Sequence, residues 1–157
     1  MKASRHAALS VPVSAAVFAL SRSIPAAIAV MVGGVLIDLD HVFDYVREYG
    51  FRIDIAHFFE TFYHTRYRRI VLLFHAWELM IALGLIASAT GWNPWLWGLT
   101  IGASTHLALD QTFNYTRPGS YFLLWRLAKG FQREKIIRQY PYQGAESDDS
   151  DGNRCAS

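Results

Sequence analysis

Long apolar stretches separated by short polar ones organise the chain and predict its helices. The stretches cover residues 7–20, 24–37, 70–89 and 95–113, and each contains at most one Asp, Glu, Lys or Arg. Their lengths approach the roughly 20 residues that a helix needs to cross a bilayer. Because the second stretch continues as a helical pattern to residue 45, we expect helices over 7–20, 25–45, 70–89 and 95–113. The pattern predicts an all-α fold, an integral membrane four-helix bundle.

Two further segments have one apolar and one polar side, which is typical of helices that lie on a membrane surface. The first, Ile53–His64, falls within the connection 46–69. The second, Tyr121–Arg138, places Leu123, Leu124, Leu127 and Phe131 on one side and Arg126, Lys129 and Arg133 on the other. We therefore expect residues 1–143 to form a single membrane-embedded helical domain. The acidic and polar residues 144–157 are expected to form a disordered tail.

Composition and charge agree with a membrane protein. Hydrophobic residues make up 52% of the chain and charged residues 18%, so the lipid bilayer is the expected partner and nucleic acid is not. With the N-terminus in the cytoplasm, the inner segments hold fourteen of the fifteen Lys and Arg residues, and only Arg22 lies outside. The positive-inside rule therefore predicts that both termini are cytoplasmic. The single Cys155 excludes a disulfide within the chain.

Three ionisable clusters interrupt the apolar stretches. They are Asp38-Leu-Asp40-His41-Val-Phe-Asp44, His75-Ala-Trp-Glu78 and His106-Leu-Ala-Leu-Asp110. Each uses i,i+3 or i,i+4 spacing, which places its polar side chains on one face of a helix. The predicted topology brings all three clusters, together with His6, to the cytoplasmic side. Ionisable groups are costly within a bilayer, so a shared polar site is the simplest explanation.

The residue types in these clusters favour a metal site. Histidine and carboxylate ligands together suit zinc first, with manganese or iron as alternatives, and one or two divalent ions are expected. The candidate ligands are His6, Asp38, Asp40, His41, Asp44, His75, Glu78, His106 and Asp110. Glu78 and Asp40 are also the candidate catalytic groups, Glu78 as a general base. A structural network of Glu78, His75 and Arg69 is the alternative, and His57 is expected to be a packing residue.

With these residues in view, the chain resembles the YdjM-type family of membrane-bound metal-dependent hydrolases over residues 6–114. The resemblance rests on His6, the stretch Gly34–His41, the stretch Leu73–Glu78 and the stretch Gly102–Asp110. Ile37 replaces the proline of the family's Pro-Asp-x-Asp-His pattern. The resemblance implies a metal-dependent hydrolase of the prokaryotic cytoplasmic (inner) membrane, with a distant kinship to zinc-dependent phospholipase C.

Three functions remain open on the sequence alone. The first is a hydrolase that acts on a phosphoester or lipid headgroup at the cytoplasmic face, because carboxylate-rich metal sites are typical of phosphoester hydrolysis. The second is a non-enzymatic membrane protein with a structural or sensing metal site. The third is a small transporter subunit. The third is disfavoured by the outer halves of the predicted spans, which carry almost no polar groups.

Overall fold

The described part of the chain is helical. The computed structural model describes residues 3–51, 54–64, 67–114 and 116–138, apart from the side chains of residues 3 and 62–64. Its elements are α1 (Ala3–Ser21), α2 (Ile24–Leu36), the 3₁₀ turn η1 (Ile37–Leu39), α3 (Asp40–Tyr49), α4 (Ile55–His64), α5 (Trp77–Ala89), α6 (Pro94–Phe113), α7 (Leu123–Ala128) and α8 (Arg133–Ile136). These ranges contain no strand, only two isolated bridges. The predicted all-α class is confirmed, and the tail 144–157 lies outside the described residues.

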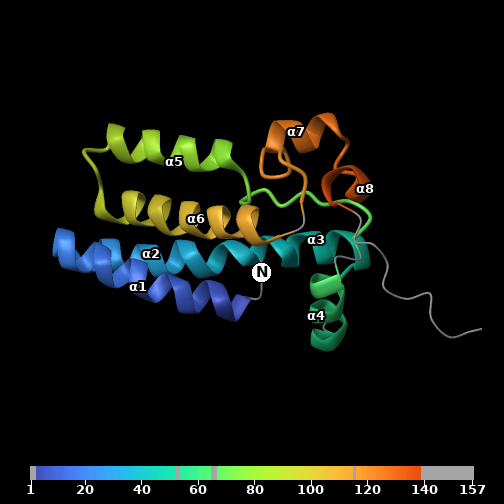
Figure 1. Ribbon diagram of the computed structural model, residues 1–157, viewed down its shortest axis with the longest axis horizontal. Helices are drawn as coiled ribbons and strands as arrows, with labels where there is room; N and C mark the ends of the chain where they lie inside the picture. The colour runs from blue at the N-terminus through green and yellow to red at the C-terminus, as the bar shows by residue number, and fades with distance from the viewer. Residues whose placement is uncertain (1–2, 52–53, 65–66, 115, 139–157) are drawn as a thin grey trace, which may run out of the picture.

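Helices α1, α2, α5 and α6 run along the long axis of the molecule, and α7 and α8 lie together beside one end of this bundle (Figure 1). The central seam is between α2 and α6, where glycine lets the two backbones approach closely. A Cβ on Gly98 would lie 2.4 Å from the carbonyl oxygen of Ala26, and one on Gly102 would lie 2.2 Å from that of Val30. The seam therefore requires glycine at both positions, in the spacing that the sequence presents.

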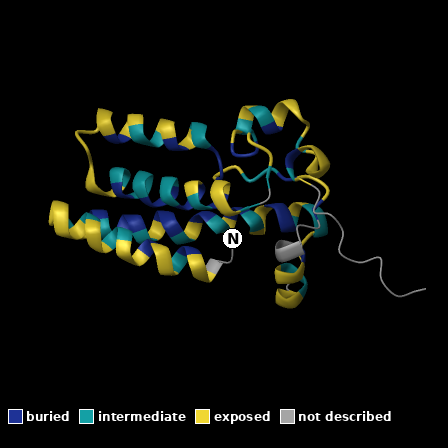
Figure 2. Ribbon diagram, in the orientation of Figure 1, coloured by how far each residue is buried: buried dark blue, intermediate teal, exposed yellow. Residues whose placement is uncertain are grey.

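The distribution of side-chain sizes is unusual for a bundle. Most buried residues of α2 and several of α6 are small, whereas many large apolar residues of the bundle helices are exposed. Figure 2 shows the exposed outer faces of these helices in yellow. The exposed set on the four bundle helices includes Leu9, Val11, Phe18, Leu20, Ile24, Ile28, Leu36, Ile81, Leu85, Ile86 and Trp95. Exposed apolar surface of this extent marks an interaction with lipid or protein.

Length and apolar composition together identify one candidate span. Among the described residues, only the continuous run Ile24–Tyr49, which joins α2, η1 and α3, is long and apolar enough to cross a membrane. Helix α5 is apolar but has only 13 residues. The prediction of a helix over residues 70–89 is wrong for its first part, because residues 70–76 are not α-helical. The other three predicted bundle helices are present.

The C-terminal region also differs from the prediction of one amphipathic helix over Tyr121–Arg138. It forms two short helices, α7 and α8, because the chain turns between them with positive φ at Gly130 (63°) and Phe131 (57°). Arg126 does not lie on a solvent-facing basic side. Its side chain is buried, with 1% of the residue exposed. We call residues 116–138 the C-terminal cap. The predicted helix within 46–69 is confirmed as α4.

Candidate metal centre

Four ionisable residues meet at the end of the bundle that carries the C-terminal cap. Asp38 comes from η1, His75 from the non-helical segment 70–76, and His106 and Asp110 from successive turns of α6. Each offers one ligand atom, and the four atoms lie within 4.8 Å of one another. Three of the residues are buried and Asp38 is half-buried. A group of two aspartates and two histidines at this spacing can hold a metal ion.

The α2–α6 seam sets the orientation of His106. Its Nδ1 lies 2.8 Å from the carbonyl oxygen of Gly34, a contact that the close packing of the two helices allows. Nδ1 therefore carries the hydrogen, and Nε2 faces the other side of the ring. From there Nε2 lies 3.3 Å from Asp38 Oδ1 and 3.6 Å from Asp110 Oδ2.

Segment 70–76 supplies His75, and α3 holds this segment in place. Asp40 Oδ2 accepts hydrogen bonds from the backbone N–H groups of Phe74 (2.6 Å) and His75 (3.3 Å). The same oxygen lies 3.4 Å from His75 Nδ1. One turn later on α3, Asp44 Oδ2 accepts from the N–H groups of Val71 and Leu72. The two carboxylates replace the hydrogen bonds that a helix would have given this segment.

Nε2 of His75 then points to the same centre as Nε2 of His106. It lies 3.6 Å from Asp38 Oδ1 and 3.8 Å from Asp110 Oδ2. Burial by itself acts to lower the pKa of His75, but the facing carboxylates of Asp38 and Asp40 outweigh it and raise the pKa. The local field therefore favours a positive charge at this point.

The spacing fits a metal ion better than a set of hydrogen bonds. The nitrogen–oxygen distances of 3.3–3.8 Å exceed the usual hydrogen-bond range of about 2.7–3.2 Å. Neither Nε2 atom has a hydrogen bond within the described ranges, although both are buried. Tetrahedral bonds of about 2.0–2.2 Å would place two ligand atoms about 3.3–3.6 Å apart. The donor set and its dimensions therefore allow a metal ion to be held, with small movements of the side chains.

Two further histidines border the centre. The ring of His6 stacks on that of His106, with centroids 3.7 Å apart, and its Nε2 lies 2.9 Å from Asp110 Oδ1. His41 packs edge-on against His75 and places its Nε2 3.8 Å from Asp38 Oδ1. The side chains of His41 and Asp38 are 17% and 16% exposed, so they mark the accessible side of the centre.

Three of the predicted ligands have other partners. Asp40 and Asp44 hold segment 70–76, as described above, and Asp40 also lies beside His75 Nδ1. The carboxylate of Glu78 accepts hydrogen bonds from the backbone N–H groups of Leu123 (2.9 Å) and Leu124 (3.1 Å) at the start of α7. The structure thus places Glu78 against the C-terminal cap and outside the group of four. The assignments of Asp40 and Glu78 as catalytic groups stay predictions, and these hydrogen bonds are the contacts that the structure gives the two carboxylates.

Sequence reasoning missed two contributors to the centre. Gly34 acts through its carbonyl, and no sequence pattern marks a backbone acceptor. The Nη2 of Arg126 donates a hydrogen bond to the carbonyl oxygen of His75 at 2.9 Å. Burial lowers the pKa of the Arg126 guanidinium, against the opposing effect of the carboxylates of Asp40 and Glu78. The position of Arg126 within an apolar run was the available signal, although the amphipathic pattern predicts it on the polar side of a surface helix.

Other predicted residues lie where packing explains them. His57 Nδ1 is 2.7 Å from the hydroxyl of Tyr45, and its ring contacts Tyr45 and Tyr49, as expected of a packing residue. The side-chain amide of Asn114 donates to the hydroxyl of Tyr121 at 3.1 Å, and its backbone N–H ends α6 by donating to the carbonyl of Asp110.

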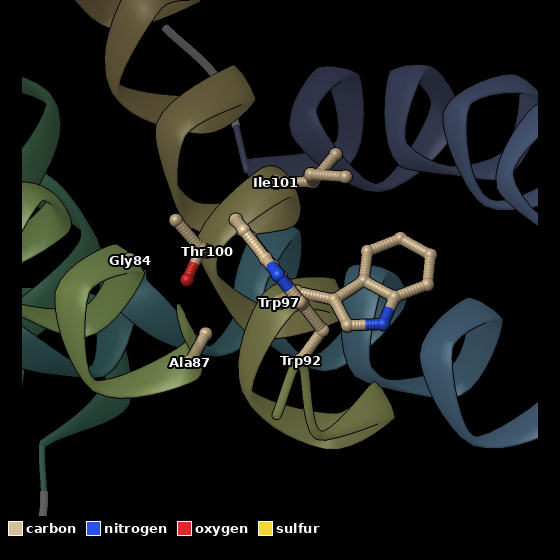
Figure 3. A pocket seen from close by; sticks show the side chains of 6 residues that line it. All are labelled: Gly84, Ala87, Trp92, Trp97, Thr100 and Ile101. Atoms are coloured by element: carbon tan, nitrogen blue, oxygen red, sulfur yellow. The ribbon is translucent and has the colours of Figure 1, made fainter. Parts of the chain in front are cut away.

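The part of the α5–α6 hairpin near its connecting loop contains an apolar pocket of about 360 Å³. Figure 3 shows its lining side chains, which are Gly84, Ala87, Trp92, Trp97, Thr100 and Ile101. The hydroxyl of Thr100 already donates to the carbonyl of Leu96 within α6. The lining has no ionisable group, so this pocket does not extend the polar centre toward the opposite end of the bundle.

The chain matched no family model, no curated protein and no solved structure.

Proposed function

We propose that this protein is a membrane-embedded, metal-dependent hydrolase that cleaves phosphoesters, with a lipid headgroup as the preferred substrate. One observation carries the proposal. Nε2 of His75 and Nε2 of His106, both buried and without a hydrogen bond within the described ranges, face the same space as carboxylate oxygens of Asp38 and Asp110. Zinc is the metal that this donor set suits best, with manganese or iron as alternatives. When bound, such an ion supplies Lewis acidity and lowers the pKa of a water ligand toward neutrality.

The residues of the chain divide the remaining work. His75, His106, Asp38 and Asp110 bind the ion, while Asp40 and the carbonyl of Gly34 fix the two imidazoles with their Nε2 atoms inward. Asp38 is the ligand nearest to solvent, and its Oδ2 is without a hydrogen bond within the described residues. That oxygen is itself buried, so it would accept a proton only from a water held inside the centre. His41, beside it, faces the side from which a substrate can approach.

The surface near the accessible side supports a substrate with an apolar part. Leu39, Val42 and Phe43 flank Asp38 and His41 on η1 and α3, and each is more than 40% exposed. The bundle presents large apolar side chains outward, as a lipid-embedded protein does. We infer an inner-membrane location with the centre at the cytoplasmic face. A phospholipid could then bring its headgroup to the centre while its chains stay in the bilayer.

A structural metal site is the second candidate, and a specific observation favours it. Four protein ligands complete a tetrahedral zinc site and leave no position for a substrate, which is the usual arrangement of structural zinc. An ion with six ligands would keep two positions open in the same group. The number of ligands that the ion takes from solvent therefore separates the two candidates.

Metal analysis of the detergent-purified protein tests the proposal. We expect about one zinc, manganese or iron ion per chain in the wild type and a clear loss in His106→Ala. The matched control is His57→Ala, which removes an imidazole that lies outside the centre. Equal metal content in all three proteins would refute the site. Phosphatidic acid and phosphatidylglycerol in mixed micelles, with a water-soluble aryl phosphate for comparison, then test hydrolysis. Full metal loading without any hydrolysis would favour the structural candidate.

A further inference from the structure

We propose that the C-terminal cap controls the metal affinity of the centre through Arg126, which acts as a positioning residue for His75. This inference rests on the metal site of the proposed function and not on the reaction. Arg126 is among the largest fully buried side chains of the described residues. Burying a guanidinium is costly, and a fold retains it where it makes a specific contact. Its Nη2 makes one such contact, with the carbonyl oxygen of His75.

The backbone and side chain of His75 are held from both sides. Asp40 accepts a hydrogen bond from the His75 N–H and lies beside His75 Nδ1. Arg126 donates a hydrogen bond to the His75 carbonyl oxygen. These contacts leave Nε2 as the ring atom that faces the centre. Because the segment before it is not helical, His75 has no helix of its own to set its position. Removing the contact from Arg126 would free the carbonyl side of His75.

Arg126 is in turn fixed by contacts between the cap and the start of α5. Glu78 accepts hydrogen bonds from the first N–H groups of α7. The N–H of Trp77 donates a hydrogen bond to the carbonyl oxygen of Tyr121 at 2.9 Å. After α7, the carbonyl oxygen of Phe131 accepts a hydrogen bond from the N–H of Ile70 at 2.9 Å. The cap is therefore joined to both ends of the segment that carries His75. Glu78 affects the metal through this path, without touching it.

The experiment compares metal affinity with stability in the full-length protein in detergent. Zn²⁺ affinity is measured by competition with a chromogenic chelator, and the unfolding midpoint is measured without metal. We expect Arg126→Gln to weaken Zn²⁺ binding about 10–100-fold, the range found for partners of metal ligands. Arg133→Gln is the matched control, because Arg133 is exposed on α8 and lies in the same cap. It should bind Zn²⁺ within twofold of wild type.

Two additional variants separate positioning from a general loss of structure. Arg126→Lys keeps a charged donor and should recover part of the affinity, and it remains informative if Arg126→Gln fails to fold. Glu78→Gln should weaken binding, and the double variant with Arg126→Gln should bind as Arg126→Gln does, because both residues act on one path. The visible spectrum of bound Co²⁺ should change in Arg126→Gln and stay the same in Arg133→Gln.

Several results would overturn the inference. Zn²⁺ binding by Arg126→Gln within twofold of Arg133→Gln would do so, and so would an affinity loss fully accounted for by a lower midpoint without metal. A wild type that binds metal but hydrolyses nothing would defeat the proposed reaction and leave this inference intact. A wild type without any affinity for Zn²⁺, Mn²⁺ or Fe²⁺ would defeat both.

Discussion

Gly102→Ala is the sharpest test of how the helix seam supports the metal centre. The new Cβ would lie 2.2 Å from the carbonyl oxygen of Val30, about 1.2 Å short of the 3.4 Å at which ordinary contact begins. The next nearest atoms, at 2.9 Å, are also backbone atoms of Val30, so no side chain can move aside. Helices α2 and α6 must therefore separate by roughly 1 Å.

That separation reaches the centre directly, because His106 lies one turn after Gly102 on α6. Its 2.8 Å contact with the carbonyl oxygen of Gly34 on α2 would lengthen to nearly 4 Å, beyond a hydrogen bond. Overpacking typically costs about 1–3 kcal/mol. For a chain of this size, that cost lowers the thermal midpoint by roughly 2–12 °C. We also expect metal content to fall, since His106 loses its fixed orientation.

Gly84→Ala is the matched control. Gly84 lies in α5, and a Cβ there would meet only the Cγ2 of Thr100, at 3.7 Å, which is ordinary contact. Alanine is favoured over glycine in a helix by about 1 kcal/mol, so this variant should unfold at or above the wild-type temperature. The assay is thermal unfolding followed by tryptophan fluorescence, with metal analysis of the same samples. A Gly102→Ala protein that melts with the wild type and keeps its metal would refute the reasoning.

Three further predictions concern Asp44, removal of the metal and the membrane topology. Asp44→Ala removes the acceptor of the Val71 and Leu72 N–H groups and should destabilise the protein by about 2–4 kcal/mol; an unchanged unfolding midpoint would contradict this role. Removing metal with a chelator should lower the thermal midpoint, because an ion at 100 times its Kd stabilises the folded state by about 2.7 kcal/mol; identical midpoints with and without chelator would count against a bound ion. The single Cys155 should react with a membrane-impermeant maleimide in inside-out vesicles and not in intact cells; the opposite pattern would reverse the topology.

The sequence predicted the parts of the fold that depend on long apolar runs. The helices Ala3–Ser21 and Pro94–Phe113 lie close to the predicted ranges, and Pro25 stands in the first turn of α2, where Ser23 accepts from the N–H of Ala26. The prediction of a helix failed for residues 70–76, because this apolar run is not helical in the structure. Its N–H groups are taken by Asp40 and Asp44, and such tertiary hydrogen bonds leave no periodic trace in the sequence.

The candidate centre was predicted by residue type more reliably than by role. His6, His75, His106 and Asp110 do meet, because spacing on α6 and the order of the helices bring them to one end. The carboxylates of Asp38, Asp40 and Asp44 lie close together in the sequence, but only Asp38 faces both imidazole Nε2 atoms, whereas Asp40 and Asp44 hold segment 70–76. Only the 3₁₀ turn at Ile37–Leu39 and the path of segment 70–76 decide which of them faces the ligands. Neither feature can be read from a single sequence.

The origin of the ligands has a consequence for how the protein is made. Asp38, His75 and Asp110 come from three different thirds of the 157-residue chain, and Arg126 follows later still. A nascent chain therefore cannot complete the centre until α6 has joined α2 and the cap has left the ribosome. If the centre holds a metal ion as proposed, loading would be a late step in biogenesis, after the first helices have formed. Until then the acidic and imidazole groups of the incomplete bundle would be apart, without the partners that surround them in the folded protein.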